Sequence, residues 1–534
     1  MPDHASTDVL IAGGGASGLM AAYRAHLAGA RVLLLTGSGG ASSRISSLNC
    51  ALGYAENDTP ADLTRDMLRA GGDVNNRRLL AALTHRIGDE IRHLTTLGVP
   101  FVRSGGGRLA RRQATGSSWS RAVYTERMVG ADVCRCVLAE MERQQADRLS
   151  IVKSGVLVDL EVTDAQITGA LAYDRRRRSY LHVSAGAVVL ATGGAGHLFG
   201  ATTNPRGSQA SGYALALEAG AELVDMEFVS FEPFVLSAPP EARGQNLPTT
   251  VLRSGARLLN GEAAEFLDTA SGPTKDVICR AMLREVRAGR GTESGSVYFD
   301  LRAVAPSVVG QYPHLIKALR ARPGRLGPGV LEILPAQHYM DGGVRIDATL
   351  STSVPGLYAV GEVSGGAHGA NRLAGAGGLE AVAGGAIAGE AAAEHARRRP
   401  AGRDGNQRPD RELASQPDRA ALARIHDALD TGCGILRSGA ELETAVAAIR
   451  ESLVIAPCSG SGAATRRRAL VALAVARSAL AREDSRGDHF RTDWPRRDDQ
   501  RWLGNVVVSL NGVADLAVRF EPAPALAPPT APGS

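Results

Sequence analysis

The chain has 534 residues, of which 44% are hydrophobic and 22% are charged, and its formal net charge is +5. This length and apolar content predict two or three domains with large buried cores. A net charge this small, spread over the whole chain, argues against a nucleic-acid-binding groove, so we expect the partners to be small molecules.

No apolar run reaches 18 residues, and the N-terminal sequence, MPDHASTDVLIAGGG, leads directly into a strand pattern without a basic region or a cleavage site. The sequence therefore predicts a cytoplasmic protein without a membrane segment. The six cysteines form no CxxC pair and have no histidine at zinc-finger spacing, so we expect reduced thiols and no metal site. These cysteines are Cys50, Cys134, Cys136, Cys279, Cys433 and Cys458.

A βαβ unit is predicted at the start of the chain. Residues 7–12 (TDVLIA) form an apolar run of strand length, residues 19–28 have the composition of an Ala-rich helix that Gly29 ends, and residues 31–36 (RVLLLT) form a second apolar run. Strands and helices that alternate in this way are typical of an α/β protein with a parallel sheet.

The next part of the chain continues this pattern. Apolar residues recur at helical spacing over 78–97, which predicts a helix that covers the sheet. Residues 155–162, 167–173 and 180–191 are predicted to be strands, and the arginine run at 175–178 falls in a solvated hairpin turn between two of them.

Residues 234–337 have a mixed strand and helix pattern, and we interpret them as an inserted capping domain. A buried strand is predicted at 354–361, and a Gly/Ala-rich helix follows it to about residue 398. These two elements return the chain to the first domain.

The C-terminal part of the chain has helical periodicity after a polar linker at 399–418. We expect a C-terminal helical domain over 419–520 and a disordered Pro/Ala tail over 521–534. The helices of this domain are predicted at 420–429, 440–453 and 464–481.

Three glycines between the first predicted strand and helix, Gly13, Gly15 and Gly18, match the pattern GxGxxG. Without β-carbons, this turn lets backbone N–H groups and the helix N-terminus approach a pyrophosphate. The sequence therefore predicts a dinucleotide site at this turn.

The dinucleotide pattern also includes an acidic residue about 20 positions later, which binds ribose hydroxyls. The chain has no acidic residue between Asp8 and Glu56, so Thr36 or Ser38 would have to take its place. This departure argues against a nicotinamide cofactor and leaves a flavin open.

Several distant segments resemble one family, the flavoproteins of succinate dehydrogenase and fumarate reductase together with L-aspartate oxidase. The likeness covers nearly the whole chain, and in length the chain is most similar to the L-aspartate oxidases. The segments are GGGASGLMAA at 13–22, ATGGAG at 191–196, TTNP at 202–205, AGAELVDMEFVSFEP at 219–233, LPAQHYMDGGVRID at 334–347, VPGLYAVGEVSGGAHGANRLAG at 354–375 and SRGDHFRTDWPRRDDQRWL at 485–503.

The resemblance implies an α/β fold with a dinucleotide-binding (Rossmann-like) FAD domain at 1–233 and 338–398. An α+β capping domain at 234–337 would interrupt it, and the C-terminal helical domain would follow. The substrate would lie between the isoalloxazine ring of FAD and the cap. Family members that bind FAD covalently have a histidine just after the second strand, but ASSRISSLN at 41–49 has none, so we expect noncovalent FAD.

The resemblance also implies which residues bind FAD. Glu362 matches the family's GE motif, and the family's NSLLE reads AGGLE here, at 376–380. This change removes two side chains but leaves backbone N–H groups at Gly377 and Gly378 to face the pyrimidine end of the flavin. The predicted FAD-binding residues are Gly13, Gly15, Ala16, Ser17, Gly18, Thr36, Ser42, Ser43, Asn49, Val156, Ala191, Thr192, Gly193, Gly194, Glu362, Gly377, Gly378 and Leu379.

Two further matches point to the substrate. Arg372 in HGANRLAG matches the family's arginine, which clamps a substrate carboxylate through two N–H groups. His338 matches the histidine of the family's HYxMGG motif, which reads HYMDGG in this chain. We expect both residues to contact the substrate.

Two motifs of this chain depart from the family at positions where the family has catalytic or substrate-binding residues. The family's FxQFHPT reads FVSFEPF, so Glu232 replaces a substrate-binding histidine and Phe234 replaces a threonine that contacts the substrate carboxylate. The family's RD in the cap reads Lys275-Asp276, although only three of the 60 basic residues are lysine. Lysine is an acid whose pKa the protein can tune, whereas arginine stays charged.

We interpret Glu232 and Lys275 as one paired change. It would suit a substrate that carries an amine, or a neutral group in place of a second carboxylate. The alternative interpretation is a salt bridge that only fills space.

The first functional hypothesis is an FAD-dependent oxidase or dehydrogenase that passes a hydride from an amino acid or carboxylate to flavin N5. Arg372 would anchor a carboxylate, His338 would orient it, and Lys275 or Glu232 would manage the proton. L-Aspartate to iminosuccinate is the closest specific candidate, with O2 or another compound as electron acceptor.

Three alternatives stay open. They are succinate/fumarate interconversion, a tailoring desaturase or oxidase that acts on an amine-containing substrate, and a flavin-binding homologue without turnover. The loss of the family's histidine at position 232 and of its arginine at position 275 argues against the first, since two carboxylates need two cationic ends. The sequence leaves the exact substrate, the electron acceptor and the oligomeric state open.

Overall fold

The computed structural model describes residues 3–37, 40–56, 58–144, 148–238, 242–269, 272–310, 312–321, 326–399, 418–455, 462–512 and 515–523. Several predictions lie outside these ranges: the role of Ser38, the thiol of Cys458, nearly all of the linker and most of the tail. The five other cysteines are free thiols.

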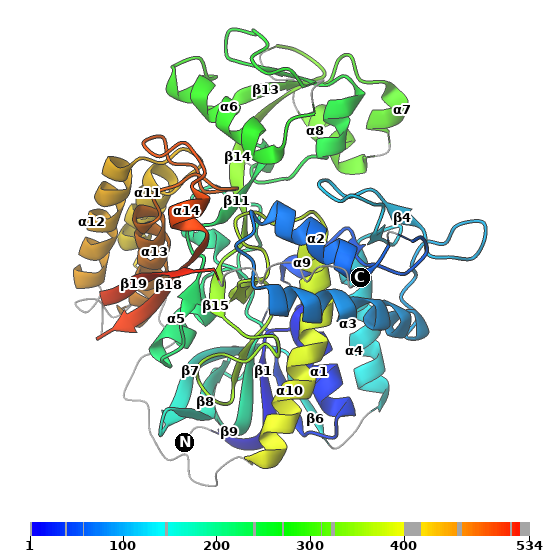
Figure 1. Ribbon diagram of the computed structural model, residues 1–534, viewed down its shortest axis with the longest axis vertical. Helices are drawn as coiled ribbons and strands as arrows, with labels where there is room; N and C mark the ends of the chain where they lie inside the picture. Colours follow the sequence, from blue (N-terminus) through cyan, green and yellow to red (C-terminus); the bar gives the residue numbers. More distant parts are fainter. Residues whose placement is uncertain are drawn as a thin grey trace, which may run out of the picture.

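The main domain is built on a seven-stranded sheet in the order β6-β2-β1-β9-β8-β7, with β16 beside β9 (Figure 1). Strands β6, β2, β1, β9 and β16 are parallel, and inner strands of such a sheet need apolar side chains on both faces. The fully buried run Val9, Leu10, Ile11 of β1 meets this need. The strands are β1 (Asp3–Ala12), β2 (Val32–Leu35), β6 (Leu149–Val152), β7 (Gly155–Thr163), β8 (Gln166–Asp174), β9 (Ser179–Leu190) and β16 (Leu357–Ala359).

Helices α1 (Ala16–Leu27) and α10 (Gly385–Arg398) pack closely against each other beside this sheet (Figure 1). Glycines permit the close approach, because a Cβ on Gly389 would overlap the carbonyl oxygen of Ala21. Helix α9 (Ala376–Leu379) and the π-helical turn η6 (Glu380–Gly384) lead directly into α10, so residues 376–398 form one continuous helical segment.

The other elements of the main domain surround this framework and include a small sheet in the order β3-β5-β4. They are η1 (Ala41–Arg44), β3 (Leu48–Asn49), α2 (Pro60–Ala70), α3 (Arg77–Thr96), β4 (Arg111–Arg112), β5 (Ala122–Val123), α4 (Val129–Gln144), η2 (Gly196–Leu198), α5 (Ser211–Glu218) and η5 (Gly361–Val363).

An antiparallel sheet in the order β11-β14-β13-β12 forms the core of the capping region, drawn at the top of Figure 1. Phe234 and Phe299 are fully buried in this core. Strands β11 and β14 contain the predicted domain limits at 233/234 and 337/338, which stay a prediction. The elements are β11 (Val229–Leu236), η4 (Thr249–Ser254), β12 (Arg257–Leu259), α6 (Lys275–Arg287), β13 (Val297–Asp300), α7 (Pro306–Val309), α8 (Pro313–Ala321) and β14 (Val330–Met340).

The predicted C-terminal helices are present as α11 (Arg419–Gly432), α12 (Gly439–Ile455) and α13 (Gly462–Ala481), and a short helix α14 (Asp499–Trp502) follows. The region also contains an antiparallel strand pair that the sequence reasoning missed, and this pair extends a five-stranded sheet. The strands of this sheet are β10 (Leu223–Val224), β15 (Gly343–Arg345), β17 (Ser364–Gly365), β18 (Gly504–Asn511) and β19 (Asp515–Pro522).

The prediction that the tail begins at residue 521 is wrong for its first two residues. Glu521 and Pro522 belong to β19, and Glu521 pairs with Arg345 at 2.7 Å. The hydrogen bonds of β18 and this ion pair hold the end of the strand in place.

The strands and helices predicted for the main domain are present. Strand β1 is longer than predicted, because it begins at Asp3 and pairs with β9 over nearly its whole length. The arginine run at 175–178 lies in an exposed turn, as predicted. In the ranges that the structure describes, no helix is long and apolar enough to cross a membrane.

Candidate active site

The turn between β1 and α1 has room only for glycine at two predicted positions. Gly13 has a φ of +128°, and a Cβ on Gly18 would overlap the carbonyl oxygen of Gly13. Helix α1 starts directly after this turn and has no acidic residue in its first turn. Its positive N-terminal end is therefore available to an anion such as a pyrophosphate.

Side chains from two neighbouring segments line the same turn. The hydroxyl of Ser42 in η1 accepts a hydrogen bond from the backbone N–H of Ala16 at 2.8 Å. A Cβ on Gly15 would come within 2.9 Å of this hydroxyl. Thr36 follows β2, and a Cβ on Gly14 would come within 2.7 Å of its Cβ. The structure thus brings Gly15, Ala16, Ser42 and Thr36 together, and their role in binding FAD stays a prediction.

Ser43 and Val156 lie at the edge of this region. The exposed hydroxyl of Ser43 donates a hydrogen bond to the carbonyl of Gly40 at 3.2 Å. A Cβ on Gly37 would come within 3.1 Å of Val156. Val156 is therefore next to the chain that follows β2, where the ribose end of a dinucleotide would lie.

The ATGG segment, residues 191–194, follows β9 and faces two environments. Gly193 has a φ of +76° and nothing within 4 Å of its missing Cβ, so its backbone can approach a ligand. A Cβ on Gly194, in contrast, would overlap the carboxylate of Glu362. Glu362 also accepts a hydrogen bond from the N–H of Met340 at 3.2 Å, and burial raises its pKa to about 7.

Ser17 and the loop before Glu362 are also in contact, because a Cβ on Gly361 would overlap the Ser17 hydroxyl. This contact joins the first turn of α1 to η5. The predicted FAD residues of the N-terminal and C-terminal parts of the main domain therefore meet at one place.

The start of α9 is tied to strand β3. The backbone N–H of Asn49 donates to the carbonyl of Gly375 at 3.2 Å. Gly377 lies beside Arg372, since its Cβ would be 3.5 Å from a guanidinium nitrogen. A Cβ on Gly378 would come within 2.6 Å of a leucine of β3, so Gly378 packs against that strand. Leu379 is fully buried behind it.

These residues fit a dinucleotide cofactor such as FAD. The side-chain oxygens of Asn49 and Thr192 are buried and have no hydrogen-bond partner among the described residues. A buried polar atom without a partner is costly, so a ligand that supplies the missing hydrogen bonds explains them. Together with the glycine turn and the free end of α1, these atoms form a cradle for a polar, phosphate-bearing molecule.

The guanidinium of Arg372 rests on the ring of Tyr339, with its Cζ 4.3 Å from the ring centroid. Among the residues that the structure describes, none forms an ion pair with Arg372, and its Nε is buried without a hydrogen-bond partner. An arginine stacked in this way keeps its N–H donors free for an anion.

His338 lies on β14 with its Nδ1 2.8 Å from the hydroxyl of Thr203. Arg44 donates a hydrogen bond to the carbonyl of the same threonine. Burial lowers the pKa of His338 to about 4, and the positive charges of Arg372 and Lys275 act in the same direction. At neutral pH, His338 is therefore an uncharged hydrogen-bonding group.

Glu232 on β11 and Lys275 at the start of α6 form an ion pair. The Glu232 side chain is 1% exposed and that of Lys275 is 40% exposed. The charge of Glu232 opposes the fall in the pKa of His338, whereas Arg372 and Lys275 support it. The structure thus brings the four predicted catalytic residues together, and the salt bridge of the alternative interpretation is present.

Two further carboxyl groups meet near β11. The hydroxyl of Ser230 lies 2.7 Å from Asp341 Oδ2 and 2.6 Å from Asp488 Oδ2. Burial raises the pKa of Asp488 to about 6 and the pKa of Asp341 well above its ordinary value. The negative charge of Asp488 adds to the effect of burial and raises the pKa of Asp341 further.

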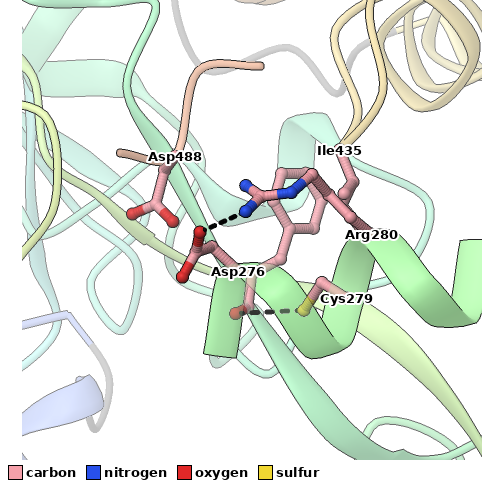
Figure 2. Close-up of a pocket in the computed structure, with 6 residues that line it drawn as sticks. Asp276, Cys279, Arg280, Ile435 and Asp488 are labelled. Carbon is pink, nitrogen blue, oxygen red and sulfur yellow. Dashed lines mark hydrogen bonds and ion pairs between the residues drawn. The ribbon is translucent and has the colours of Figure 1, made fainter. Parts of the chain in front are cut away.

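Asp488 also lines a small pocket between α6 and the C-terminal region (Figure 2). Asp276 pairs there with Arg280 at 2.7 Å, and Cys279 Sγ lies 3.7 Å from the carbonyl of Phe231. Neither Arg372 nor His338 lines this pocket. We place the candidate active site at those two residues and therefore outside the pocket. The pocket residues are Phe231, Asp276, Cys279, Arg280, Ile435 and Asp488.

Sequence reasoning missed several residues of this site. Tyr339 and Asp341 lie within HYMDGG and Glu380 within AGGLE, so these motifs contained a signal for them. Thr203 likewise lies within TTNP at 202–205, whereas Arg44 gave no such signal. Within the described ranges, no cluster of three or more His, Cys, Asp or Glu residues could hold a metal ion.

Known proteins resemble the chain over nearly its full length. A family model described as FAD binding domain matches residues 8–377, and one described as fumarate reductase flavoprotein C-term matches residues 463–527. The chain is 34% identical to L-aspartate oxidase of Streptomyces coelicolor, over 99% of this chain and 96% of that protein.

Two further comparisons have similar coverage. The chain is 30% identical to one subunit of the fumarate reductase (CoM/CoB) of Methanothermobacter marburgensis, over 94% of this chain and 97% of that protein. The solved structure of Mycobacterium smegmatis Sdh1 in complex with UQ1 superimposes with a TM-score of 0.88 and 26% identity, over 99% of this chain and 96% of that one.

Proposed function

This chain belongs to the flavoprotein family of succinate dehydrogenase, fumarate reductase and L-aspartate oxidase, and we propose that this FAD-dependent oxidoreductase oxidises an amino acid to its imine. L-Aspartate, which would give iminosuccinate, is the first candidate substrate. Its support is the identity to L-aspartate oxidase over nearly the full chain.

The observation that carries the proposal is the free guanidinium of Arg372 on the ring of Tyr339. Its Nε is buried without a hydrogen-bond partner, and no carboxylate among the described residues forms an ion pair with it. The guanidinium can therefore bind an anion. A substrate carboxylate satisfies this group through two parallel hydrogen bonds, which also fix the orientation of the substrate.

The cofactor is FAD, which supplies a hydride acceptor. We propose that the glycine turn and the end of α1 bind its pyrophosphate, and that Ser42, Asn49 and Thr192 contribute side-chain hydrogen bonds. The segment 41–49 has no histidine, so we propose that the cofactor is held noncovalently.

Proton transfer in this reaction is assigned to the Glu232–Lys275 pair. Oxidation of an amine to an imine removes a hydride from the α-carbon and a proton from the nitrogen. The Glu232 carboxylate accepts that proton. Lys275, which is partly exposed, connects Glu232 to solvent, to which the proton is then released. His338 is uncharged at neutral pH, so it orients the substrate through hydrogen bonds and adds no second positive charge.

One observation favours a second candidate, an amino acid whose far end is neutral or carries an amine. A dicarboxylate needs positive groups at both ends. In this site Lys275 is already paired with Glu232, and His338 is uncharged. This charge balance also argues against succinate/fumarate interconversion.

Anaerobic mixing of the FAD-loaded protein with a panel of acids tests the proposal. The panel holds L-aspartate, neutral and basic L-amino acids, and succinate, and the loss of flavin absorbance is followed. We expect bleaching by at least one amino acid, with formation of the matching 2-oxo acid after imine hydrolysis. Bleaching by succinate alone, or by no member of the panel, would contradict the proposal.

A further inference from the structure

Glu380 is a fully buried carboxylate that receives three hydrogen bonds. Its Oε2 lies 2.9 Å from His368 Nε2 and 3.0 Å from the Tyr339 hydroxyl, and its Oε1 lies 3.1 Å from the Ser364 hydroxyl. Burial alone would raise its pKa, but His368 and these hydrogen bonds outweigh burial and hold the pKa of Glu380 below its ordinary value. Glu380 is therefore a fixed anion beneath the candidate active site.

Tyr339 connects this anion to Arg372. Its hydroxyl donates to Glu380, and its ring face carries the guanidinium of Arg372 at 4.3 Å. The ring also packs edge-on against His368, with 5.4 Å between the ring centroids. Rotation about the second side-chain torsion leaves the hydroxyl oxygen in place, but a phenolic O–H lies in the plane of the ring. A hydrogen bond from this hydroxyl to a fixed acceptor therefore favours one orientation of the ring.

Arg372 has few other contacts that could hold it. In the described part of the chain, no carboxylate pairs with it and its Nε has no partner. The Tyr339 ring beneath it therefore contributes to the orientation of its guanidinium, together with the charges of Asp341 and Glu362.

The backbone at Glu380 has an unusual conformation, which positions its carboxylate for the hydrogen bond from Tyr339. Glu380 is the first residue of the π-helical turn η6, which interrupts the helical segment between α9 and α10. Such turns are rare, cost hydrogen-bond quality and occur mostly at functional sites. The turn places the Glu380 carboxylate where Tyr339, His368 and Ser364 reach it.

We propose that Glu380 is a positioning residue: through the Tyr339 hydroxyl it sets the ring on which Arg372 rests, and thereby the affinity for a substrate carboxylate. His368 and Ser364 hold Glu380 in place. The inference rests on the proposed function, in which Arg372 binds that carboxylate. A displacement of about 1 Å is enough to cost roughly 100-fold in rate.

The test disrupts the hydrogen bond between Tyr339 and Glu380 by substituting first the donor and then the acceptor. Tyr339→Phe keeps the ring and loses the hydroxyl, and Glu380→Gln keeps the shape and loses the charge. The FAD-loaded protein is titrated with malonate, or with the monocarboxylate propionate if the second carboxylate of malonate prevents binding, while the flavin absorbance reports binding. We expect each variant to bind malonate roughly 10-fold more weakly, the scale of one hydrogen bond to a charged group. The double variant should bind no more weakly than the weaker single variant.

A matched control is Tyr358→Phe. Tyr358 is another buried tyrosine of the main domain, and its hydroxyl donates to the carbonyl of Ala391 at 3.3 Å. Loss of that hydrogen bond should leave malonate affinity unchanged. FAD content and Tm are measured for every variant, because a purely structural role would change these two quantities and not the malonate affinity.

Arg372→Lys separates the failure of this inference from the failure of the proposed function. If the wild-type protein binds neither malonate nor propionate, or if Arg372→Lys binds the same carboxylate equally well, the proposed function is wrong. If Arg372→Lys weakens binding while Tyr339→Phe binds like the wild type, only the positioning inference is overturned. Additive effects of the two substitutions would also overturn it. Tyr339→Phe decides the outcome even where Glu380→Gln fails to fold.

Discussion

Glu232 on strand β11 and Lys275 at the start of helix α6 form an ion pair at the junction of the main domain and the capping region. Because the Glu232 side chain is only 1% exposed, loss of Lys275 would leave a buried charge without its partner. The two positions are therefore coupled, and a change at one calls for a change at the other. In the proposed function, the Glu232 carboxylate also neutralises the positive charge of Lys275, which would otherwise attract a second substrate carboxylate.

This coupling predicts the effect of restoring the family residues together. Glu232→His with Lys275→Arg places two groups that can carry positive charge where the wild type has a balanced pair. For the second candidate, a native substrate whose far end is neutral or carries an amine, we expect kcat/KM for L-aspartate, succinate or fumarate to rise about 10-fold, the scale of one charge-assisted hydrogen bond. We expect kcat/KM for that native substrate to fall. Steady-state kinetics on both substrate classes measure this change.

Lys275→Met serves as the control for the double variant. It should lower the Tm more than the double variant does, since it removes the positive charge that balances the buried Glu232 carboxylate. If the wild-type protein already prefers L-aspartate and the double variant changes little, the altered-substrate interpretation is wrong and the pair only fills space.

The glycine turn predicts a specific loss of cofactor. A Cβ on Gly18 would overlap the carbonyl oxygen of Gly13, so Gly18→Ala must push the turn apart. Overpacking of this kind costs about 1–3 kcal/mol, or roughly 5- to 150-fold in affinity. We expect the dissociation constant for FAD to rise by this factor. The control is Gly105→Ala, where nothing lies within 4 Å of the added Cβ, and unchanged FAD binding by Gly18→Ala would place the cofactor elsewhere.

The absence of a histidine from residues 41–49 predicts that FAD is released when the protein unfolds. Acid precipitation should leave the yellow colour in the supernatant and a colourless pellet. Gel electrophoresis under denaturing conditions should show no fluorescent protein band after acid treatment. Colour that stays with the denatured chain would contradict noncovalent binding.

Arg372 should be the strongest single determinant of catalysis. Arg372→Lys keeps the positive charge but loses the planar fork that makes two parallel hydrogen bonds. We expect kcat/KM to fall by roughly 100-fold or more, with FAD content unchanged, because the substrate would shift by about 1 Å from its productive position. Stopped-flow measurement of flavin reduction separates weaker binding from slower chemistry. Unchanged kinetics would show that the substrate binds elsewhere.

Local patterns in the sequence predicted the parts of the site that depend on local structure. The strand, the glycine turn and the helix around Gly13 and Gly18 are set by residues close together in the chain. Motif context located Arg372 and His338 for the same reason. The sequence also predicted that Glu232 and Lys275 act as a pair, because both depart from the family's motifs, and the two side chains form an ion pair in the structure.

Contacts between distant segments could not be predicted in this way. Ser230, Asp341 and Asp488 come from β11, the end of β14 and the C-terminal region, and only the folded sheets bring them together. The strand pair β18–β19 was missed because the run around Val506 and Val508 is short, and its burial comes from pairing with β10 and β19.

The carboxyl groups of Asp341 and Asp488 lead to a prediction about stability and pH. Burial raises the pKa of Asp488 to about 6 and that of Asp341 well above the ordinary value of 3.8. Asp276 raises the pKa of Asp488 further, whereas Arg437 and Arg372 lower the pKa of Asp488 and Asp341 respectively. Between about pH 4 and these raised values, the folded protein holds protons that the unfolded chain has released. The contribution of the pair to stability therefore decreases as the pH rises through this window.

Asp341→Asn tests this sign, because an amide donates a hydrogen bond to Asp488 without a proton that titrates. We expect the free energy of unfolding of the wild type, relative to the variant, to fall between pH 5 and pH 8, by about 1.4 kcal/mol for each unit of pKa shift in that range. Urea unfolding at several pH values in excess FAD measures this difference. Asp300→Asn is the control. The pKa of Asp300 is lowered to about 2, so its carboxylate is charged in the folded and unfolded states above pH 5. The difference in the free energy of unfolding between the wild type and Asp300→Asn should therefore stay constant over this range. A wild-type advantage that grows with pH would show that the pKa values of Asp341 and Asp488 are not raised in the folded protein.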